Sequence, residues 1–272
     1  MENQPGGRPK LEVPRQKYAP EQSEDCLFLD VYAPVKNFDK EGNPKEKLPV
    51  IVYFPGGAYA FGSKDLGGKL PLYSGLSILR AQKYEAVFVT GNYRLGAYGW
   101  LAGPYMESEA QPNAGLYDQA LLLEWVQKYI KQAGGDPDRV TAWGQSTGAG
   151  SIMHHLIREG GTKDPLFHNI LVQSPAFEWS YDTSENGSLD NIYRKFSQLA
   201  GCKYAYDISC LRAQTPEKLA AANQQLFVEV GQSGIFPIGP SVDGQWIQKI
   251  PAASFATGRH SPIDVTVMLK RD

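Results

Sequence analysis

The stretch that decides the fold is Arg139-Val140-Thr141-Ala142-Trp143-Gly144-Gln145-Ser146-Thr147-Gly148. Its first half is a strand-like run, and a helical segment follows over residues 151–158. Between them lies a Gly-x-Ser-x-Gly pattern, which is weak alone but informative at a strand-to-helix turn. Such a turn holds its serine in a strained conformation, and the flanking glycines let the strand and helix backbones approach. We therefore expect Ser146 to be an exposed nucleophile facing the positive end of a helix dipole.

Two apolar runs predict strands that are buried on both faces. Residues 49–54 end at Pro55-Gly56-Gly57, and residues 86–90 end at Gly91. Continuous β-branched and aromatic runs are typical of a parallel sheet covered by helices. Alternating strands and helices predict a doubly wound α/β fold with a mostly parallel central sheet flanked by helices. The other expected elements are strands over 27–32, 169–173 and 262–269, and an amphipathic helix over 116–132 that Gly134-Gly135 ends.

Small residues also follow the strand at 49–54. Consecutive small residues at a strand end leave backbone N–H groups free to face a cleft, and the N–H of Thr147 points to the same region. Such donors stabilise a tetrahedral oxyanion by about 3 kcal/mol each. Alone, Gly56-Gly57 indicates an ordinary turn. Beside the Ser146 turn, it favours an oxyanion hole.

Composition excludes several classes of protein. The 272 residues carry 27 Lys plus Arg against 29 Asp plus Glu, so no basic excess exists to replace phosphate counterions and we expect no nucleic-acid partner. No apolar run approaches the roughly 20 residues that span a bilayer, so we expect no transmembrane segment. The polar segment 1–15 lacks the apolar region of a signal peptide, which predicts a cytoplasmic location.

The three cysteines and the glycine-rich segments predict neither a metal nor a cofactor. Cys202 and Cys210 are either two unrelated thiols or a short-loop disulfide, which contributes roughly 2.5 kcal/mol in the chain-entropy model. Cys26 has no evident partner, and no metal-ligand spacing occurs. No Gly-x-Gly-x-x-Gly is present, and Gln173-Ser174 stands where an acidic residue would contact a nucleotide, which excludes nucleotide binding.

The segment Ser23-Glu24-Asp25-Cys26-Leu27-Phe28-Leu29-Asp30-Val31-Tyr32 resembles the Ser-Glu-Asp-Cys-Leu-x-Leu-Asn-Val motif of type-B carboxylesterases and the related fungal lipases and cholinesterases. Similar matches cover most of residues 23–244, at 49–62, 92–95, 113–119, 134–141 and 240–244.

This resemblance implies an α/β-hydrolase that cleaves small-molecule or lipid esters through an acyl-enzyme on Ser146. Gly57, Ala58 and Thr147 match the oxyanion-hole donors of the family. The resemblance also implies a Cys202–Cys210 disulfide and a secreted location, and it implies no cofactor. It says nothing of the oligomeric state.

The sequence departs from the family pattern in its acid and its histidine. In the family, the triad acid follows the next core strand and the histidine comes far beyond it. Here that strand is expected over 265–269, and Asp272 is the last residue. His154 and His155 lie eight and nine residues after Ser146 on one helix. At about 1.5 Å per residue, this spacing carries them more than a turn away from the serine. We expect His168 and His260 in loops that do not supply a base.

The sequence therefore predicts a serine ester hydrolase truncated at both ends. The expected organisation is a flexible lead-in over 1–22 and a partial α/β-hydrolase domain over 23–272, with a mainly helical, cap-like region over 182–235. The family also has a long segment before the first motif, including the cysteine that pairs with Cys26, and only a short lead-in is present here. The alternative is a catalytically inactive binding or interaction protein of the same fold.

Overall fold

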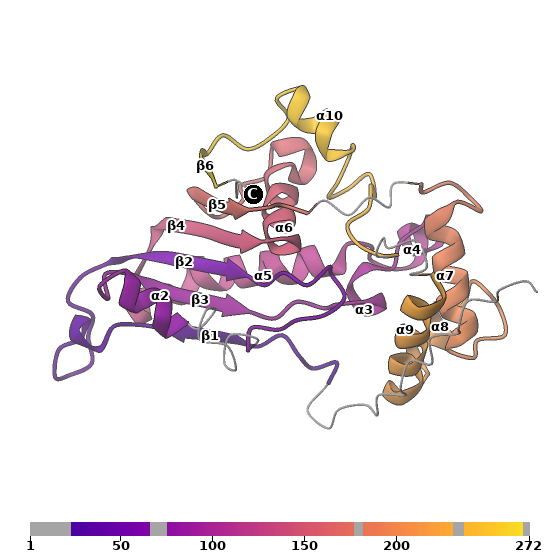
Figure 1. Ribbon diagram of the computed structural model, residues 1–272, viewed down its shortest axis with the longest axis horizontal. Helices are drawn as coiled ribbons and strands as arrows, with labels where there is room; N and C mark the ends of the chain where they lie inside the picture. Colours follow the sequence, from indigo (N-terminus) through magenta and orange to yellow (C-terminus); the bar gives the residue numbers. More distant parts are fainter. Residues whose placement is uncertain (1–22, 66–74, 177–181, 231–236, 269–272) are drawn as a thin grey trace, which may run out of the picture.

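A computed structural model describes residues 23–65, 75–176, 182–230 and 237–268 (Figure 1). Six strands form one sheet in the order β1-β3-β2-β4-β5-β6. β1 is antiparallel to β3 and every other pair is parallel, which confirms the expected mostly parallel sheet. The lead-in expected over 1–22 and the terminal Asp272 lie outside the described residues. The strands are β1 (Leu29–Tyr32), β2 (Leu48–Phe54), β3 (Val87–Gly91), β4 (Gly135–Gln145), β5 (Asn169–Gln173) and β6 (Asp264–Met268).

The start of β4 differs from the expectation. The strand begins at Gly135 rather than Arg139, and Gly135 pairs with Leu48 of β2. Gly134 adopts a left-handed conformation (φ 75°) and caps the preceding 3-10 turn, η3 (Ile130–Ala133). A Cβ on Gly135 would lie 2.6 Å from the Ile130 side chain, so the chain passes tightly against the helix that it has just left. One glycine therefore ends the helix while the next begins the strand.

Two helices cover one face of the sheet. They are α5 (Ala114–Tyr129), which with η3 accounts for the helix expected over 116–132, and α6 (Thr147–Leu156). Their apolar side chains pack with those of four strands in a buried core. On the opposite face, α2 (Gly75–Ala81) contributes Leu79 to a smaller cluster with Tyr53 and Phe88. The main core includes Val50, Val52, Phe54, Val87, Val89, Leu123, Val126, Val140, Ala142 and Ile152.

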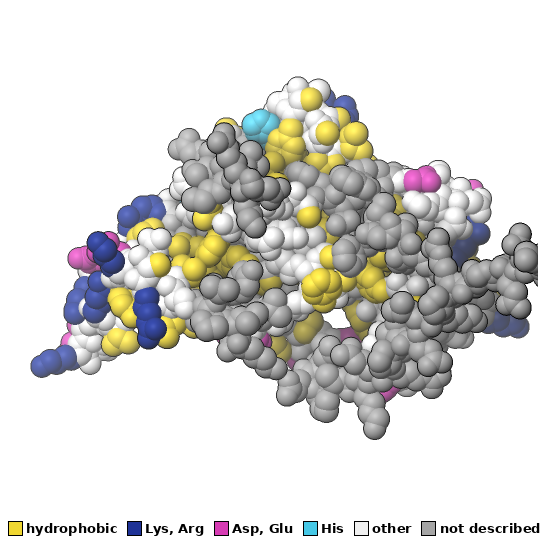
Figure 2. Space-filling view, viewed as in Figure 1, with side chains coloured by type: hydrophobic (Ala, Val, Ile, Leu, Met, Phe, Trp, Pro, Cys, Tyr) yellow, Lys and Arg dark blue, Asp and Glu magenta, His cyan; other side chains and the backbone are white. Residues whose placement is uncertain are grey.

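Different features lie at the two ends of the parallel strands. Figure 1 shows α7 (Ser188–Leu199), α8 (Ile208–Arg212) and α9 (Pro216–Val230) beyond the carboxyl ends. Figure 2 shows a group of Lys and Arg side chains at the opposite, left end of the molecule. A disulfide joins Cys202 to Cys210, as the family resemblance implied. That this helical region is a separate cap remains a prediction. The remaining elements are η1 (Val35–Asn37), α3 (Ala97–Trp100), α4 (Pro104–Glu109), η4 (Arg158–Gly161) and α10 (Pro251–Ala256).

None of the helices in the described ranges is both long enough and apolar enough to cross a membrane.

A third cluster of buried side chains lies under the helical region and joins it to α3 and α5. Its largest fully buried members are Trp100, Trp246, Tyr59 and Tyr193. The helical region is therefore anchored through apolar packing near the carboxyl ends of the strands.

Candidate active site

Ser146 lies in the turn between β4 and α6. Its backbone is left-handed (φ 56°, ψ −126°), a conformation that costs about 1–3 kcal/mol and persists only where the surroundings enforce it. The Ser146 N–H donates to the carbonyl oxygen of Gln173 at 3.0 Å, and its own carbonyl accepts from Gly150 at 2.9 Å and Ala176 at 3.0 Å. These three hydrogen bonds tie the serine to the end of β5, to the chain beyond it and to the first turn of α6.

The glycines on either side of Ser146 are required by close backbone contacts. A Cβ on Gly144 would lie 2.5 Å from the carbonyl carbon of Gly148. A Cβ on Gly148 would lie 2.1 Å from the carbonyl oxygen of Phe54, the last residue of β2. Neither glycine has a positive φ, so lack of space rather than backbone conformation excludes a side chain there. The strand and the helix thus approach as the Gly-x-Ser-x-Gly pattern predicts.

The turn after β2 lies directly against Ser146. A Cβ on Gly56 would be 3.2 Å from the Cβ of Ser146. Gly57 follows at φ 127°, where a Cβ would clash with the carbonyl of Phe61 at 1.9 Å, and Ala58 is left-handed at φ 55°. The Gly57 carbonyl accepts the N–H groups of Ala60 at 2.9 Å and Phe61 at 3.0 Å. We call residues 55–59 the oxyanion turn, after the role that the family resemblance implies for Gly57 and Ala58.

Three backbone N–H groups near Ser146 are available as donors. Between residues that the structure describes, no hydrogen bond uses the N–H of Gly57 or Ala58. Thr147 is the first residue of α6, so its N–H has no acceptor within the helix. Ala58 and Thr147 are only 8% and 1% exposed, and a hydrogen bond in such a place is electrostatically stronger than in water. Gly57 and Ala58 directly follow Gly56, and Thr147 directly follows Ser146. All three N–H groups therefore belong to the two turns that approach each other at Gly56 and Ser146.

The two histidines on α6 are buried in the core. His154 and His155 are 0% and 1% exposed, and burial lowers the pKa of each to about 3, so both are neutral near pH 7. His155 Nε2 lies 3.2 Å from Oε1 of Gln119, and its ring stacks on Phe54. These are the contacts of structural residues within the main core.

The other two histidines lie at the far ends of the elements that hold Ser146. His168 immediately precedes β5, and its Nδ1 accepts the Val140 N–H at 3.3 Å. At about 3.3 Å per residue, the length of β5 separates it from Ser146. His260 lies beside Gly161, beyond the carboxyl end of α6, and is exposed. A general base must come within about 3 Å of the hydroxyl, and both of these histidines lie at the opposite ends of the elements that meet at Ser146.

An ion pair joins two segments that match family motifs in the sequence. The guanidinium of Arg94, after β3, donates to both carboxylate oxygens of Asp118 on α5 at 2.8 Å, and the Arg94 backbone N–H donates to the same carboxylate at 2.9 Å. The Asp118 side chain is only 4% exposed. The pair fixes the loop after β3 to α5. Opposite charges in two distant motifs were the only signal in the sequence.

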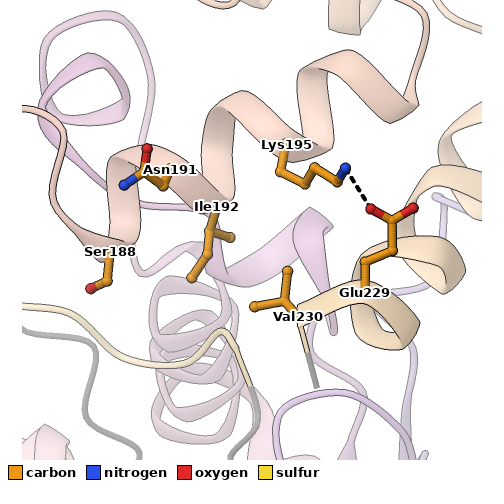
Figure 3. Close-up of a pocket in the computed structure, with 6 residues that line it drawn as sticks. All are labelled: Ser188, Asn191, Ile192, Lys195, Glu229 and Val230. Atoms are coloured by element: carbon orange, nitrogen blue, oxygen red, sulfur yellow. Dashed lines mark ion pairs between the residues drawn. The ribbon is translucent and has the colours of Figure 1, made fainter. Parts of the chain in front are cut away.

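A hollow lies between α7 and α9 (Figure 3). Lys195 Nζ and Glu229 Oε2 pair at 2.5 Å on its wall, and the ammonium lowers the pKa of Glu229. These two charges neutralise each other, so the pair adds no net charge to the hollow. The hollow is lined by Ser188, Asn191, Ile192, Lys195, Glu229 and Val230.

Among the described residues, no group of three or more His, Cys, Asp and Glu side chains is placed to hold a metal ion.

A mostly parallel sheet with a serine held in a tight turn between a central strand and the following helix defines the α/β-hydrolase class. The sequence matches the Carboxylesterase family over residues 3–270, and the chain belongs to this family. The resemblance in the motifs is thereby confirmed.

Proteins similar in sequence and solved structures similar in fold include lipases and esterases. A secreted lipase of Arthroderma benhamiae is 41% identical over 237 residues, covering 87% of this chain and 44% of the lipase. Lipase 1 of Geotrichum candidum is 34% identical, covering 89% and 43%. The solved structure of a PNB esterase matches with a TM-score of 0.78 at 32% identity, covering 94% of this chain and 51% of the esterase. The chain thus spans less than half the length of these two lipases.

Proposed function

We propose that this chain supplies the nucleophile and the oxyanion hole of a carboxylic ester hydrolase that acts through an acyl-enzyme on Ser146. The observation that carries the proposal is the contact between Gly56 and Ser146, which sets the oxyanion turn against the serine. Membership in the carboxylesterase family supports the same chemistry.

The chemistry follows from these groups. The Ser146 hydroxyl attacks the ester carbonyl carbon and its proton passes to a general base. The carbonyl oxygen becomes an oxyanion that accepts hydrogen bonds from the N–H groups of Gly57, Ala58 and Thr147. Collapse of this intermediate expels the alcohol, which takes the proton back from the base. Water then attacks the acyl-enzyme by the same route and releases the acid.

The base and the acid that orients it come, in this proposal, from residues outside these 272. Two observations support this: all four histidines lie away from Ser146, and the chain corresponds to 44% of the length of its secreted lipase relative. A nucleophile and an oxyanion hole without a base give slow chemistry, because the oxyanion hole and binding alone leave about 10³–10⁴-fold catalysis over water.

The substrates we propose are small-molecule or lipid esters, as the names of the relatives suggest. We further propose that the protein is secreted, rather than cytoplasmic. The Cys202–Cys210 disulfide supports an oxidising compartment, and the Arthroderma benhamiae relative is named a secreted lipase. A net charge of −2 supports the expectation of no nucleic-acid partner. We propose that residues 182–235 act as a cap over the site.

A fluorophosphonate probe tests the proposal, because it reacts covalently with a serine hydroxyl beside an oxyanion hole, and the reaction is slow where no base is present. We expect slow, stoichiometric labelling of the wild-type chain, complete loss of labelling in Ser146→Ala, and normal labelling in Ser108→Ala, a change at an exposed serine on α4. Absence of labelling in the wild type would overturn the proposal. It would favour the second candidate, a non-catalytic binding protein, which the distant positions of all four histidines also suggest.

A further inference from the structure

Tyr93 is buried beneath the oxyanion turn. It follows β3 in the chain and is 5% exposed, with its ring edge against Trp100 at a centroid distance of 6.2 Å. Its hydroxyl donates a hydrogen bond of 2.6 Å to the carbonyl oxygen of Pro55. Pro55 immediately precedes Gly56 and Gly57, so this bond fixes the first peptide group of the oxyanion turn.

The same hydroxyl lies beside Thr147. Burial raises the pKa of Tyr93, and a weaker opposing effect comes from the neighbouring Thr147 hydroxyl. The phenol thus bonds the Pro55 carbonyl and has the Thr147 hydroxyl in its surroundings. Tyr93 thus bonds one of the two chain segments that carry the proposed oxyanion donors and lies near the other.

The oxyanion turn needs such external support. Gly57, Ala58 and Tyr59 have φ angles of 127°, 55° and 57°, and left-handed backbone is costly for the two residues that have a Cβ. Strained backbone of this kind persists only where surrounding contacts enforce it. At the far end of the turn, the Tyr59 carbonyl accepts the Gly96 N–H at 2.8 Å. The near end is held through Pro55.

We propose that Tyr93 is a positioning residue for the oxyanion hole. Its hydroxyl holds the Pro55 carbonyl beside Thr147, and this sets the separation between the Gly57 and Ala58 N–H groups and the Thr147 N–H. The inference rests on the proposed function, since it concerns the same site. Tyr93 acts through the backbone and not on the ester itself.

The variant Tyr93→Phe removes one oxygen atom and keeps the ring. Tyr193→Phe is the matched control, because Tyr193 is also buried and its hydroxyl has no hydrogen-bond partner among the described residues. The substrates are p-nitrophenyl acetate and its thiono analogue, in which sulfur replaces the carbonyl oxygen. Sulfur is a weaker hydrogen-bond acceptor, so the ratio of the two acylation rates reports the oxyanion hole and not general stability.

We expect Tyr93→Phe to lower the acylation rate with the oxygen ester by about tenfold at unchanged KM, because misplaced oxyanion donors lose part of their effect. The acylation rate with the thionoester should change much less. The ratio of the oxygen-ester rate to the thionoester rate therefore falls in Tyr93→Phe, while Tyr193→Phe keeps the wild-type ratio. Circular dichroism at the assay temperature checks that both variants are folded.

Two results would overturn the inference alone: wild-type rates with both substrates in Tyr93→Phe, or an equal loss with both substrates, which a purely structural role produces. In both cases the proposed function stands if Ser146→Ala abolishes acylation. If the wild type acylates no faster than Ser146→Ala, the proposed function fails and the inference fails with it.

Discussion

Gly148 of α6 lies against Phe54 of β2 so closely that a Cβ at position 148 would come within 2.1 Å of the Phe54 carbonyl oxygen. The oxyanion turn begins at the residue after Phe54, and Ser146 lies two residues before Gly148. This single backbone contact therefore sets the distance between the two chain segments of the candidate site. It also makes residue 148 a sensitive point for stability.

Gly148→Ala should lower the free energy of unfolding by about 3 kcal/mol, because the new methyl group meets a backbone oxygen that cannot turn aside. Gly258→Ala is the control. Gly258 has φ 68° and open space around its Cα, so alanine there adds only backbone strain of about 1 kcal/mol. Urea unfolding followed by circular dichroism measures both variants, and equal losses would show that the clash is relieved by movement of α6.

The sequence predicted the elements that local patterns determine. β5 has the expected bounds because an apolar run between polar ends forms a complete strand within a few residues. The expected reason for Gly144 and Gly148 was also correct, because their spacing around Ser146 follows from one local turn. The parallel order follows from the alternation of strands and helices.

Features that depend on which loops meet in space could not be predicted. The Tyr93–Pro55 hydrogen bond and the Arg94–Asp118 ion pair each join residues that are more than twenty positions apart. The sequence placed Pro55 at a strand end and Asp118 in a helix, but no local pattern indicated that Tyr93 and Arg94 would contact them. The early start of β4 at Gly135 was missed because a glycine pair usually indicates a break, and here it is both a helix end and a strand start.

Asp118→Asn should lower the free energy of unfolding by about 2 kcal/mol. The substitution keeps the shape of the side chain but removes the charge that balances the Arg94 guanidinium, which is 40% exposed and so retains some hydration. The matched control is Asp136→Asn, which breaks the more exposed pair with Arg139 and should have a much smaller effect. Thermal or urea unfolding compares them. Similar losses in the two variants would contradict the structural role of the buried carboxylate.

The Cys202–Cys210 disulfide closes a short loop between α7 and α8, with a sequence separation of 8. Reducing it should lower the free energy of unfolding by about 2.5 kcal/mol, mainly through the greater entropy of the unfolded chain. The measurement is urea unfolding with and without dithiothreitol. A variant with serine at both positions should unfold like the reduced protein and should not respond to the reductant. A response of that variant would point to Cys26 instead.

The two buried histidines on α6 should make the fold sensitive to mild acid. Burial lowers the pKa of His154 and His155 to about 3, below the ordinary value of 6.5. The unfolded chain therefore binds protons below pH 6.5 that the folded chain does not bind until about pH 3. Their contribution to stability is complete above pH 6.5 and declines as the pH falls, by about 1.4 kcal/mol per pH unit for each histidine.

His155→Gln should reduce that slope by about half between pH 5 and pH 6, since one of the two groups no longer titrates. Glutamine is chosen because its amide N–H can still bond Gln119 Oε1, the present neighbour of His155 Nε2. Asp39 and Asp182 do not interfere in this range, because their pKa values lie below the ordinary 3.8 and their effects appear only in stronger acid. Urea unfolding at half-unit pH steps gives the slopes. Above pH 7 the free energies of unfolding of the wild type and His155→Gln should change with pH in parallel. Identical slopes between pH 5 and pH 6 would mean that His155 gains a proton without loss of the fold, and so that the core around α6 admits water.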